Sequence, residues 1–446
     1  MNTENKNSRR DFVKTSAVLT GGAMAMPLLS KANFFSGADD TIKVALIGCG
    51  GRGTGAAMQA CLTKQNVKLV AMADAFRDRI DNCYKSLTVD DITEGSGTAK
   101  NIKNRIDVPE ERKYTGFDGY KKAMAHADVV ILTTPPGFRP IHFEEAVKQG
   151  KQIFMEKPVA TDPAGIKRVL DAAEIAKQKK LNVVVGLQRH YQTSYRALYA
   201  KKDLIGDITS AQAWWNNDGV WVNPRKAEQT EMEYQMRNWY YFVWLCGDHI
   251  VEQHIHNIDV INWFKGGYPI KAQGMGGRQV RKGKDHGEIY DHHYVEFQYA
   301  DGSILNSQCR HIPGTMSKVD ELLIGTKGKI FCGTAAIKDH AGNVLFQFDK
   351  KANENEPYQN EHDELFAAIA KGEYKFADAE NGAKSTMTAI MGRMATYSGQ
   401  VLDWNKLINS EINIMPKEFA WDAMPPTLPD ADGYYSVAVP GKTKYI

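Results

Sequence analysis

Short apolar runs alternate with stretches of helical character through the first third of the chain. The runs cover residues 42–47, 67–73, 129–134 and 152–155, and they consist largely of aliphatic and β-branched side chains. A short apolar run bounded by turn residues predicts a buried strand, and strands alternating with helices predict a parallel sheet. This part of the chain is therefore expected to form a doubly wound α/β domain.

The rest of the chain has a different pattern, with many strands and few helices. Residues 211–218 predict a strand, and a long irregular insertion with Trp221, Trp239 and Tyr240 follows it. Further strands are predicted near residues 269–280, 289–299, 303–310, 320–326 and 328–333. Helices are expected from 361 to 371 and from 383 to 399, and the tail beyond Leu402, with several prolines and no periodicity, is expected to wrap the surface.

Residues 247–264 have the periodicity of one amphipathic helix. At about 100° per residue, five polar or aromatic side chains fall within an arc of roughly 80°. They are His249, Glu252, His256, Asp259 and Trp263. Apolar residues face the other way, and because the polar arc has no Lys or Arg, it is an unusual solvent face and a candidate for chemistry.

The chain has 446 residues, of which 43% are hydrophobic and 24% charged, so two globular domains are expected. Its first 32 residues are of another kind: Arg9-Arg10 and Lys14 precede an apolar run that ends at Ser30-Lys31-Ala32. This order predicts a twin-arginine signal, and hence export of the folded protein to the periplasm. Gly21, Gly22 and Pro27 interrupt the run, so no membrane anchor is expected.

Without residues 1–32 the chain keeps 51 Lys and Arg against 51 Asp and Glu, a formal net charge of zero. Nucleic acid is therefore not an expected partner. The six cysteines show no CxxC or metal-ligand spacing, and most are expected to be buried free thiols.

A glycine motif follows the first predicted strand and opens a helix. Its residues are Gly48, Cys49, Gly50, Gly51, Arg52 and Gly53. In this GxGxxG pattern the glycines allow a tight turn and close approach of the backbone to a pyrophosphate, which then lies at a helix N-terminus. Asp74 ends the second strand, 21 residues after Gly53, where an acid accepts hydrogen bonds from ribose hydroxyls. NAD is therefore favoured over NADP, although Arg77 leaves NADP open.

Further motifs follow the later strands: Thr134-Pro135-Pro136 with His142, Gly150-Lys151, and Glu156-Lys157-Pro158. With the glycine loop and Asp74, they resemble the glucose-fructose oxidoreductase and inositol dehydrogenase family, Gfo/Idh/MocA. The resemblance covers essentially the whole chain after residue 32. It implies a Rossmann domain at 41–158, an α+β domain with a large, mostly antiparallel open sheet at 159–380, and a C-terminal helix and tail at 381–446. A homo-oligomer, dimer or tetramer, is also implied.

The resemblance implies a role for each site residue. Lys157 would lie near the nicotinamide, His256 would be the general base, and Glu252 would orient the base or bind a substrate hydroxyl. Glu252 departs from the family's usual aspartate, and His254 from a small residue. The other expected cofactor contacts are Gly48, Gly50, Gly51, Arg52, Gly53, Asp74, Thr134, Pro135, His142 and Glu156. The other expected substrate contacts are Gln188, Arg189, His190, Tyr191, Trp214, Asn216 and His249.

The spacing of His249, Glu252 and His256 also suits a metal, with Asp291-His292-His293 as a source of further ligands, but no metal is expected. The leading hypothesis is an NAD-dependent oxidoreductase that acts on a ring CH–OH of a sugar or glycoside. An NAD-dependent glycosidase, similar to the family's α-N-acetylgalactosaminidases, is the first alternative. A non-enzymatic nucleotide or sugar sensor is the second.

Overall fold

A parallel sheet of six strands forms the first layer of the protein. The structure is a computed structural model and describes residues 40–89 and 101–444. The strands are β1 (Ile42–Ile47), β2 (Val67–Asp74), β3 (Lys113–Thr115), β4 (Val129–Leu132), β5 (Gln152–Met155) and β6 (Val183–Val185). Their order is β3-β2-β1-β4-β5-β6, and all neighbours pair in parallel. This is the order of a Rossmann fold, as predicted.

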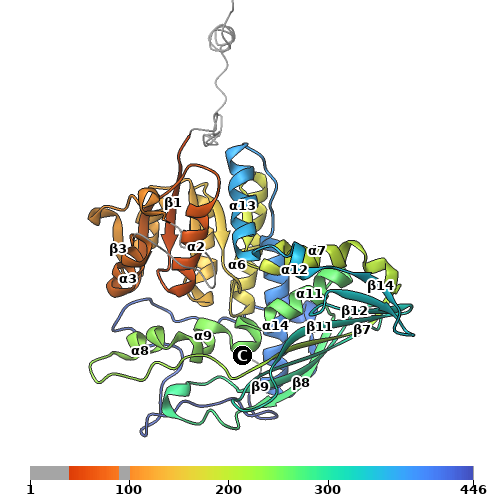
Figure 1. The fold of residues 1–446 in the computed structure, drawn as a ribbon. Helices are drawn as coiled ribbons and strands as arrows, with labels where there is room; N and C mark the ends of the chain where they lie inside the picture. Colours follow the sequence, from red (N-terminus) through yellow and green to blue (C-terminus); the bar gives the residue numbers. More distant parts are fainter. Residues whose placement is uncertain (1–39, 90–100, 445–446) are drawn as a thin grey trace, which may run out of the picture. The chain divides into compact units, whose positions relative to one another are not determined.

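Helices flank this sheet on both faces, because its strands are apolar on both sides. They are α2 (Gly51–Leu62), α3 (Arg77–Leu87), α4 (Gly119–Met124), α5 (Arg139–Lys148) and α6 (Pro163–Gln178). In β4, for example, all four residues are buried. α13 (Pro357–Ala370), from much later in the chain, packs against α2 (Figure 1).

A second sheet has nine strands in the order β14-β13-β12-β11-β7-β10-β9-β8-β15. They are β7 (Ile208–Asn217), β8 (Lys271–Gly277), β9 (His292–Gln298), β10 (Ile304–His311), β11 (Lys318–Gly325), β12 (Gly328–Phe331), β13 (Ala336–Asp339), β14 (Val344–Gln347) and β15 (Leu402–Asp403). Only the β7–β10 pair among them is parallel. The sheet is thus mostly antiparallel, as the resemblance implied.

One face of the second sheet is covered by helices, and the other is open. α14 (Ala379–Ser398) packs against β8, β9 and α6 and so joins the two sheets (Figure 1). α11 (Ile255–Lys265) packs on β7 and β11. The remaining helices are α7 (Thr193–Ala200), α8 (Glu231–Arg237), α9 (Val243–Cys246), α10 (His249–Glu252), α12 (Lys350–Asn353) and α15 (Trp404–Ile408).

The single helix predicted over 247–264 is wrong, because the structure has two short helices there, α10 and α11. The regular backbone hydrogen bonds of an α-helix, each spanning four residues, are interrupted between α10 and α11. The His254 amide donates to the His249 carbonyl at 3.1 Å, and the His256 amide donates to the Gln253 carbonyl at 3.2 Å. These bonds span five and three residues, so α10 and α11 do not form one regular helix.

All six cysteines are buried and free, which agrees with the prediction of buried thiols. Within residues 40–89 and 101–444, no helix is both long and apolar enough to cross a bilayer. The predicted export signal, residues 1–32, lies outside the described residues.

Candidate functional site

The glycine loop lies between β1 and α2, and each glycine has a distinct reason to be there. A Cβ on Gly48, whose φ is +99°, would lie 2.6 Å from the Thr134 amide nitrogen. A Cβ on Gly53 would lie 1.9 Å from the Gly48 carbonyl oxygen. Gly50 and Gly51 instead face open space, with no described atom within 4 Å of an added Cβ. No side chain caps α2, so its first amides are available to a pyrophosphate.

Asp74 lies at the carboxyl end of β2, beside this loop. Its carboxylate accepts hydrogen bonds from the amides of Cys49, at 2.7 Å, and Phe76, at 2.9 Å. Burial raises the Asp74 pKa above its ordinary value, and these amide bonds oppose the change. Arg77, which left NADP open, pairs with Asp81 and Glu110. An acid held in this way suits a ribose diol and repels a 2′-phosphate.

A pocket opens beside Asp74 at the same edge of the sheet. Its lining residues are Ile47, Ala73, Asp74, Ala75, Gly116, Phe117, Tyr120, Thr134, Phe138, His142 and Met236. The Thr134 hydroxyl lies 3.1 Å from His142 Nδ1, and the buried Arg139 donates to the Thr134 carbonyl. Burial lowers the His142 pKa to about 3, so this ring is neutral. Pro135 starts the same turn, directly before the short helix at 136–138.

Arg52 and Glu156, both predicted to contact the cofactor, bind one another. Arg52 Nε donates to Glu156 Oε1 at 2.5 Å, and Arg52 Nη2 lies 3.5 Å from Glu361. The guanidinium thus connects the glycine loop to the end of β5 and to α13. Their side chains hold the loop against these elements, which leaves the loop's backbone amides as the phosphate-binding groups.

Lys157 follows β5 and contacts α10. Its Nζ donates to Glu252 Oε1 at 2.9 Å and to the Glu252 carbonyl oxygen at 2.6 Å. His256 lies close enough for the Lys157 charge to act on it. Burial, and then the positive charges of Lys157 and Arg189, hold the His256 pKa well below its ordinary value. His256 is therefore a neutral imidazole that can accept a proton.

The segment Gln188–Tyr191 lies beside this cluster, but most of its polar side chains are already paired. Arg189 pairs with the buried Glu321, and Tyr191 donates to Asp378 at 2.8 Å. His190 Nε2 lies 2.6 Å from Asp259, and its ring stacks on Trp263. Burial lowers the His190 pKa, but the Asp259 carboxylate outweighs this effect and the pKa is raised overall. Only Gln188 in this segment has a buried side-chain oxygen with no partner among the described residues.

Trp214 and Asn216, two predicted substrate contacts, lie on the wrong face of β7. Side chains alternate along a strand, and it is Trp215 that stacks near His256, with ring centroids 6.0 Å apart. Trp214 lies under Lys318, and Asn216 contacts Gln308 on the open face. These two predictions are therefore corrected in favour of Trp215.

His249, another predicted substrate contact, lies in the interior of the protein. It is fully buried, and its Nδ1 lies 2.8 Å from Asp248. Tyr240 and Arg281, which were not among the predicted contacts, each have a buried polar atom without a partner among the described residues. Burial raises the Tyr240 pKa well above its ordinary value, and the charge of Glu252 adds to this effect. Sequence reasoning had only the aromatic character of the insertion as a signal for Tyr240, and no signal for Arg281.

Several buried polar atoms of the residues described above have no hydrogen-bond partner in the part of the chain that the structure describes. They are Trp215 Nε1, Tyr240 Oη, His256 Nδ1, Arg281 Nη1 and Gln188 Oε1. An unpaired buried polar atom costs roughly 1–3 kcal/mol. Donors and acceptors gathered in this way suit a ligand with many hydroxyl groups.

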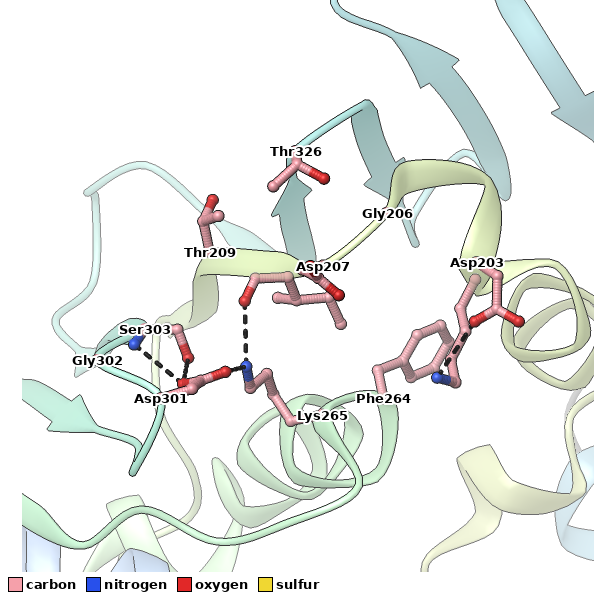
Figure 2. A pocket seen from close by; sticks show the side chains of 12 residues that line it. Asp203, Gly206, Asp207, Thr209, Phe264, Lys265, Asp301, Gly302, Ser303 and Thr326 are labelled. Atoms are coloured by element: carbon pink, nitrogen blue, oxygen red, sulfur yellow. Dashed lines mark hydrogen bonds and ion pairs between the residues drawn. The ribbon is translucent and has the colours of Figure 1, made fainter.

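A separate cavity of about 930 Å³ lies at the other end of β7 (Figure 2). Figure 2 shows Lys265 bonded to Asp301, and the two groups are 2.5 Å apart. None of the predicted site residues lines this cavity. Two of the charges that line it, Lys265 and Asp301, neutralise one another.

Known proteins are similar to this chain in sequence and in fold. Residues 42–187 match the GFO_IDH_MocA family, described as an oxidoreductase family with an NAD-binding Rossmann fold. The inositol 2-dehydrogenase of Gluconacetobacter diazotrophicus is 30% identical over 173 residues, 38% of this chain and 45% of that protein. That of Agrobacterium fabrum is 25% identical over 272 residues, 60% of this chain and 66% of that protein. This chain thus matches less than two thirds of the length of either relative.

Solved structures share the fold across both sheets. Scyllo-inositol dehydrogenase from Lactobacillus casei, with bound NAD(H) and scyllo-inositol, superposes with a TM-score of 0.60 at 19% identity, covering 82% of this chain and 100% of that one. A levoglucosan dehydrogenase in complex with NADH gives a TM-score of 0.61 at 14% identity, covering 82% of this chain and 99% of that one. Residues 42–187 thus form a Rossmann domain that matches the NAD-binding fold of this oxidoreductase family.

Proposed function

We propose that this protein is an NAD-dependent oxidoreductase that oxidises a ring CH–OH group of a sugar, cyclitol or glycoside. The observation that carries the proposal is the contact of Lys157 Nζ with Glu252, beside the neutral His256, at the edge of the sheet that holds the glycine loop. The relatives' names, inositol 2-dehydrogenase and levoglucosan dehydrogenase, support a polyhydroxylated ring as the substrate class.

In this proposal three side chains divide the work, and bound NAD supplies the hydride acceptor. His256 accepts the hydroxyl proton, because its lowered pKa keeps it unprotonated in the resting state. Lys157 places its positive charge beside the oxygen as it becomes an alkoxide, which favours loss of hydride from the same carbon. Glu252 holds Lys157 in position through two hydrogen bonds. The unpaired atoms of Trp215, Tyr240 and Arg281 would bind further hydroxyl groups.

Export through the twin-arginine route to the periplasm is part of the proposal and rests on residues 1–32 of the sequence. Because free NAD is scarce outside the cytoplasm, the nucleotide would have to stay bound. The C-terminal tail offers a means of retention. Trp421 packs 4.7 Å from the Phe117 ring, and Phe419 packs 5.2 Å from Phe138. Phe117 and Phe138 line the pocket beside Asp74, so the tail covers its rim.

A homo-oligomer, dimer or tetramer, is also proposed, with the open face of the second sheet as its interface. This face carries exposed apolar side chains, including Met275 of β8, which is 71% exposed. Contiguous exposed apolar side chains are typical of protein interfaces.

The first test is to denature the purified protein and assay the nucleotide it releases. The native protein is then mixed with inositols, free sugars, glycosides and levoglucosan, while the absorbance of reduced nicotinamide is recorded. Bound NAD that is reduced by one substrate class is the expected result. Release of free sugar without net NADH would replace the dehydrogenase with the glycosidase. Bound nucleotide with no turnover on any of these compounds would favour a sensor.

A further inference from the structure

A second cluster of titratable side chains lies beneath α10, outside the proposed catalytic group. Asp248, His249 and His293 each offer a ligand-type atom, and these three atoms lie within 4.8 Å of one another. All three residues are buried, with exposures of 0%, 0% and 3%. Asp248 precedes α10, whereas His293 lies in β9, so the cluster joins two elements distant in sequence.

His293 has one ring nitrogen held by a hydroxyl group and one without a hydrogen-bond partner. Its Nδ1 lies 2.9 Å from the Thr396 hydroxyl, which itself donates to the Arg393 carbonyl at 2.8 Å. Its Nε2 faces Asp248 Oδ2 at 3.2 Å and has no hydrogen-bond partner among the described residues. A buried polar atom without a partner is costly, and a ligand bound there would satisfy it.

The spacing of His293 and Asp248 is close to that of two ligands around one metal ion. With metal–nitrogen and metal–oxygen bonds of about 2.0–2.2 Å, neighbouring ligand atoms of a tetrahedral shell lie roughly 3.4 Å apart. His293 Nε2 lies 3.2 Å from Asp248 Oδ2. His249 Nδ1 is hydrogen-bonded to Asp248 Oδ1 at 2.8 Å, whereas its Nε2 has no partner among the described residues.

The surroundings resemble the outer shell of a metal site. The Tyr397 hydroxyl and the Tyr290 amide donate to Asp248 Oδ2, at 2.6 and 2.9 Å, and fix the carboxylate. Thr396 fixes His293 in the way that outer-shell groups orient a ligating imidazole. His311 stacks on His249 with ring centroids 4.3 Å apart, and its Nδ1 has no partner in the described part of the chain. It adds a further nitrogen beside the cluster.

We propose that Asp248, His249 and His293 bind one divalent transition-metal ion, with zinc the best match for two imidazoles and a carboxylate. Zinc commonly takes nitrogen and carboxylate ligands together. Because the three residues are buried away from solvent, the metal is structural. It fixes the start of α10, the helix that ends in Glu252, against β9. The proposal does not depend on which substrate the protein oxidises.

The test is the metal content of the full-length protein, expressed with added zinc and dialysed thoroughly, measured by inductively coupled plasma mass spectrometry. About one zinc per chain is expected. His293→Ala should lose it, whereas His292→Ala should keep it. His292 is the matched control because it is the neighbouring histidine of β9 and pairs with Asp291 instead. Circular dichroism shows whether each variant is folded.

A second measurement uses the unaltered protein and decides the matter if His293→Ala does not fold. Removal of zinc with a chelator should lower the melting temperature, and added Zn²⁺ should restore it. Co²⁺ should bind in its place and give visible d–d absorption. Folded protein that holds no stoichiometric metal and gives no Co²⁺ spectrum overturns the proposal. So does a His293→Ala protein that keeps a full equivalent of zinc.

Discussion

The ammonium group of Lys157 donates to both the carboxylate and the backbone carbonyl of Glu252, residues 95 positions apart in the chain. This contact ties the end of β5 in the first sheet to α10 beside the second. It holds a positive charge where the proposed substrate oxygen would become an alkoxide.

Replacing Lys157 with Met should therefore remove the positive charge that stabilises the forming alkoxide, without changing the binding of NAD. We expect turnover of the best substrate to fall on the order of 10²–10³-fold, the range seen when one stabilising donor is lost. The amount of NAD released on denaturation should not change. Lys167→Met is the control, because Lys167 is an exposed lysine of α6 that pairs only with Asp171. An unchanged rate in Lys157→Met would remove this residue from the chemistry.

Gly50 and Gly53 should respond differently to Ala. At Gly50 an added Cβ meets open space and φ is an ordinary −75°, so the protein should fold normally. That space is where a pyrophosphate would lie, so NAD affinity should fall by at least about tenfold, or about 1.4 kcal/mol. Gly53→Ala should destabilise the fold itself, because its Cβ would lie 1.9 Å from a backbone oxygen.

Calorimetric titration with NAD and thermal melting separate these two effects. Gly55→Ala is the matched control in the same helix, since its Cβ would meet only the flexible end of Arg52, at 3.2 Å. If Gly50→Ala binds NAD as tightly as the unaltered protein, the pyrophosphate does not lie over this loop.

The aromatic contacts of the tail should slow the release of NAD. Trp421 packs on both Phe117 and Phe76. Each aromatic pair contributes about 0.5–1.5 kcal/mol, so Trp421→Ala should raise the NAD dissociation rate roughly two- to tenfold. Stopped-flow displacement of bound NADH measures this rate. Tyr434→Ala, at a half-exposed aromatic residue of the same tail, should leave it unchanged. Equal rates in all three proteins would show that the tail does not retain the nucleotide.

His362 should make the protein less stable in acid. It is fully buried on Phe154, and burial, followed by the charge of Arg52, holds its pKa well below 6.5. Below pH 6.5 the unfolded chain binds a proton on this residue and the folded chain does not. The contribution of neutral His362 to the free energy of unfolding is therefore constant above pH 6.5. Below pH 6.5 this contribution decreases as the pH falls, by up to about 1.4 kcal/mol per pH unit.

Urea unfolding of the nucleotide-free protein at several pH values tests this. His362→Gln should show a shallower loss of stability between pH 6.5 and 5 than the unaltered protein. His340→Gln, at an exposed histidine, should have the unaltered slope. If the free energy of unfolding depends on pH in the same way in His362→Gln and in the unaltered protein, His362 has the same pKa in the folded and the unfolded state.

The sequence by itself determined the first sheet, the glycine loop, the acid at Asp74 and the main strands of the second sheet. These features depend on neighbours in the chain, since apolar runs, turn glycines and strand ends are all local signals. It also indicated Lys157, Glu252 and His256 through their motifs, although their contact was not visible in it.

Only the tertiary structure decided which residues meet. His249, in the same short helix as Glu252, pairs with Asp248 in the interior, and the alternation of side chains along β7 puts Trp215 rather than Trp214 beside His256. The grouping of Asp248 with His293, and of Trp421 with Phe117, joins residues 45 and 304 positions apart. Such contacts follow from strand order, helix register and the path of the tail, which no local pattern of side chains specifies.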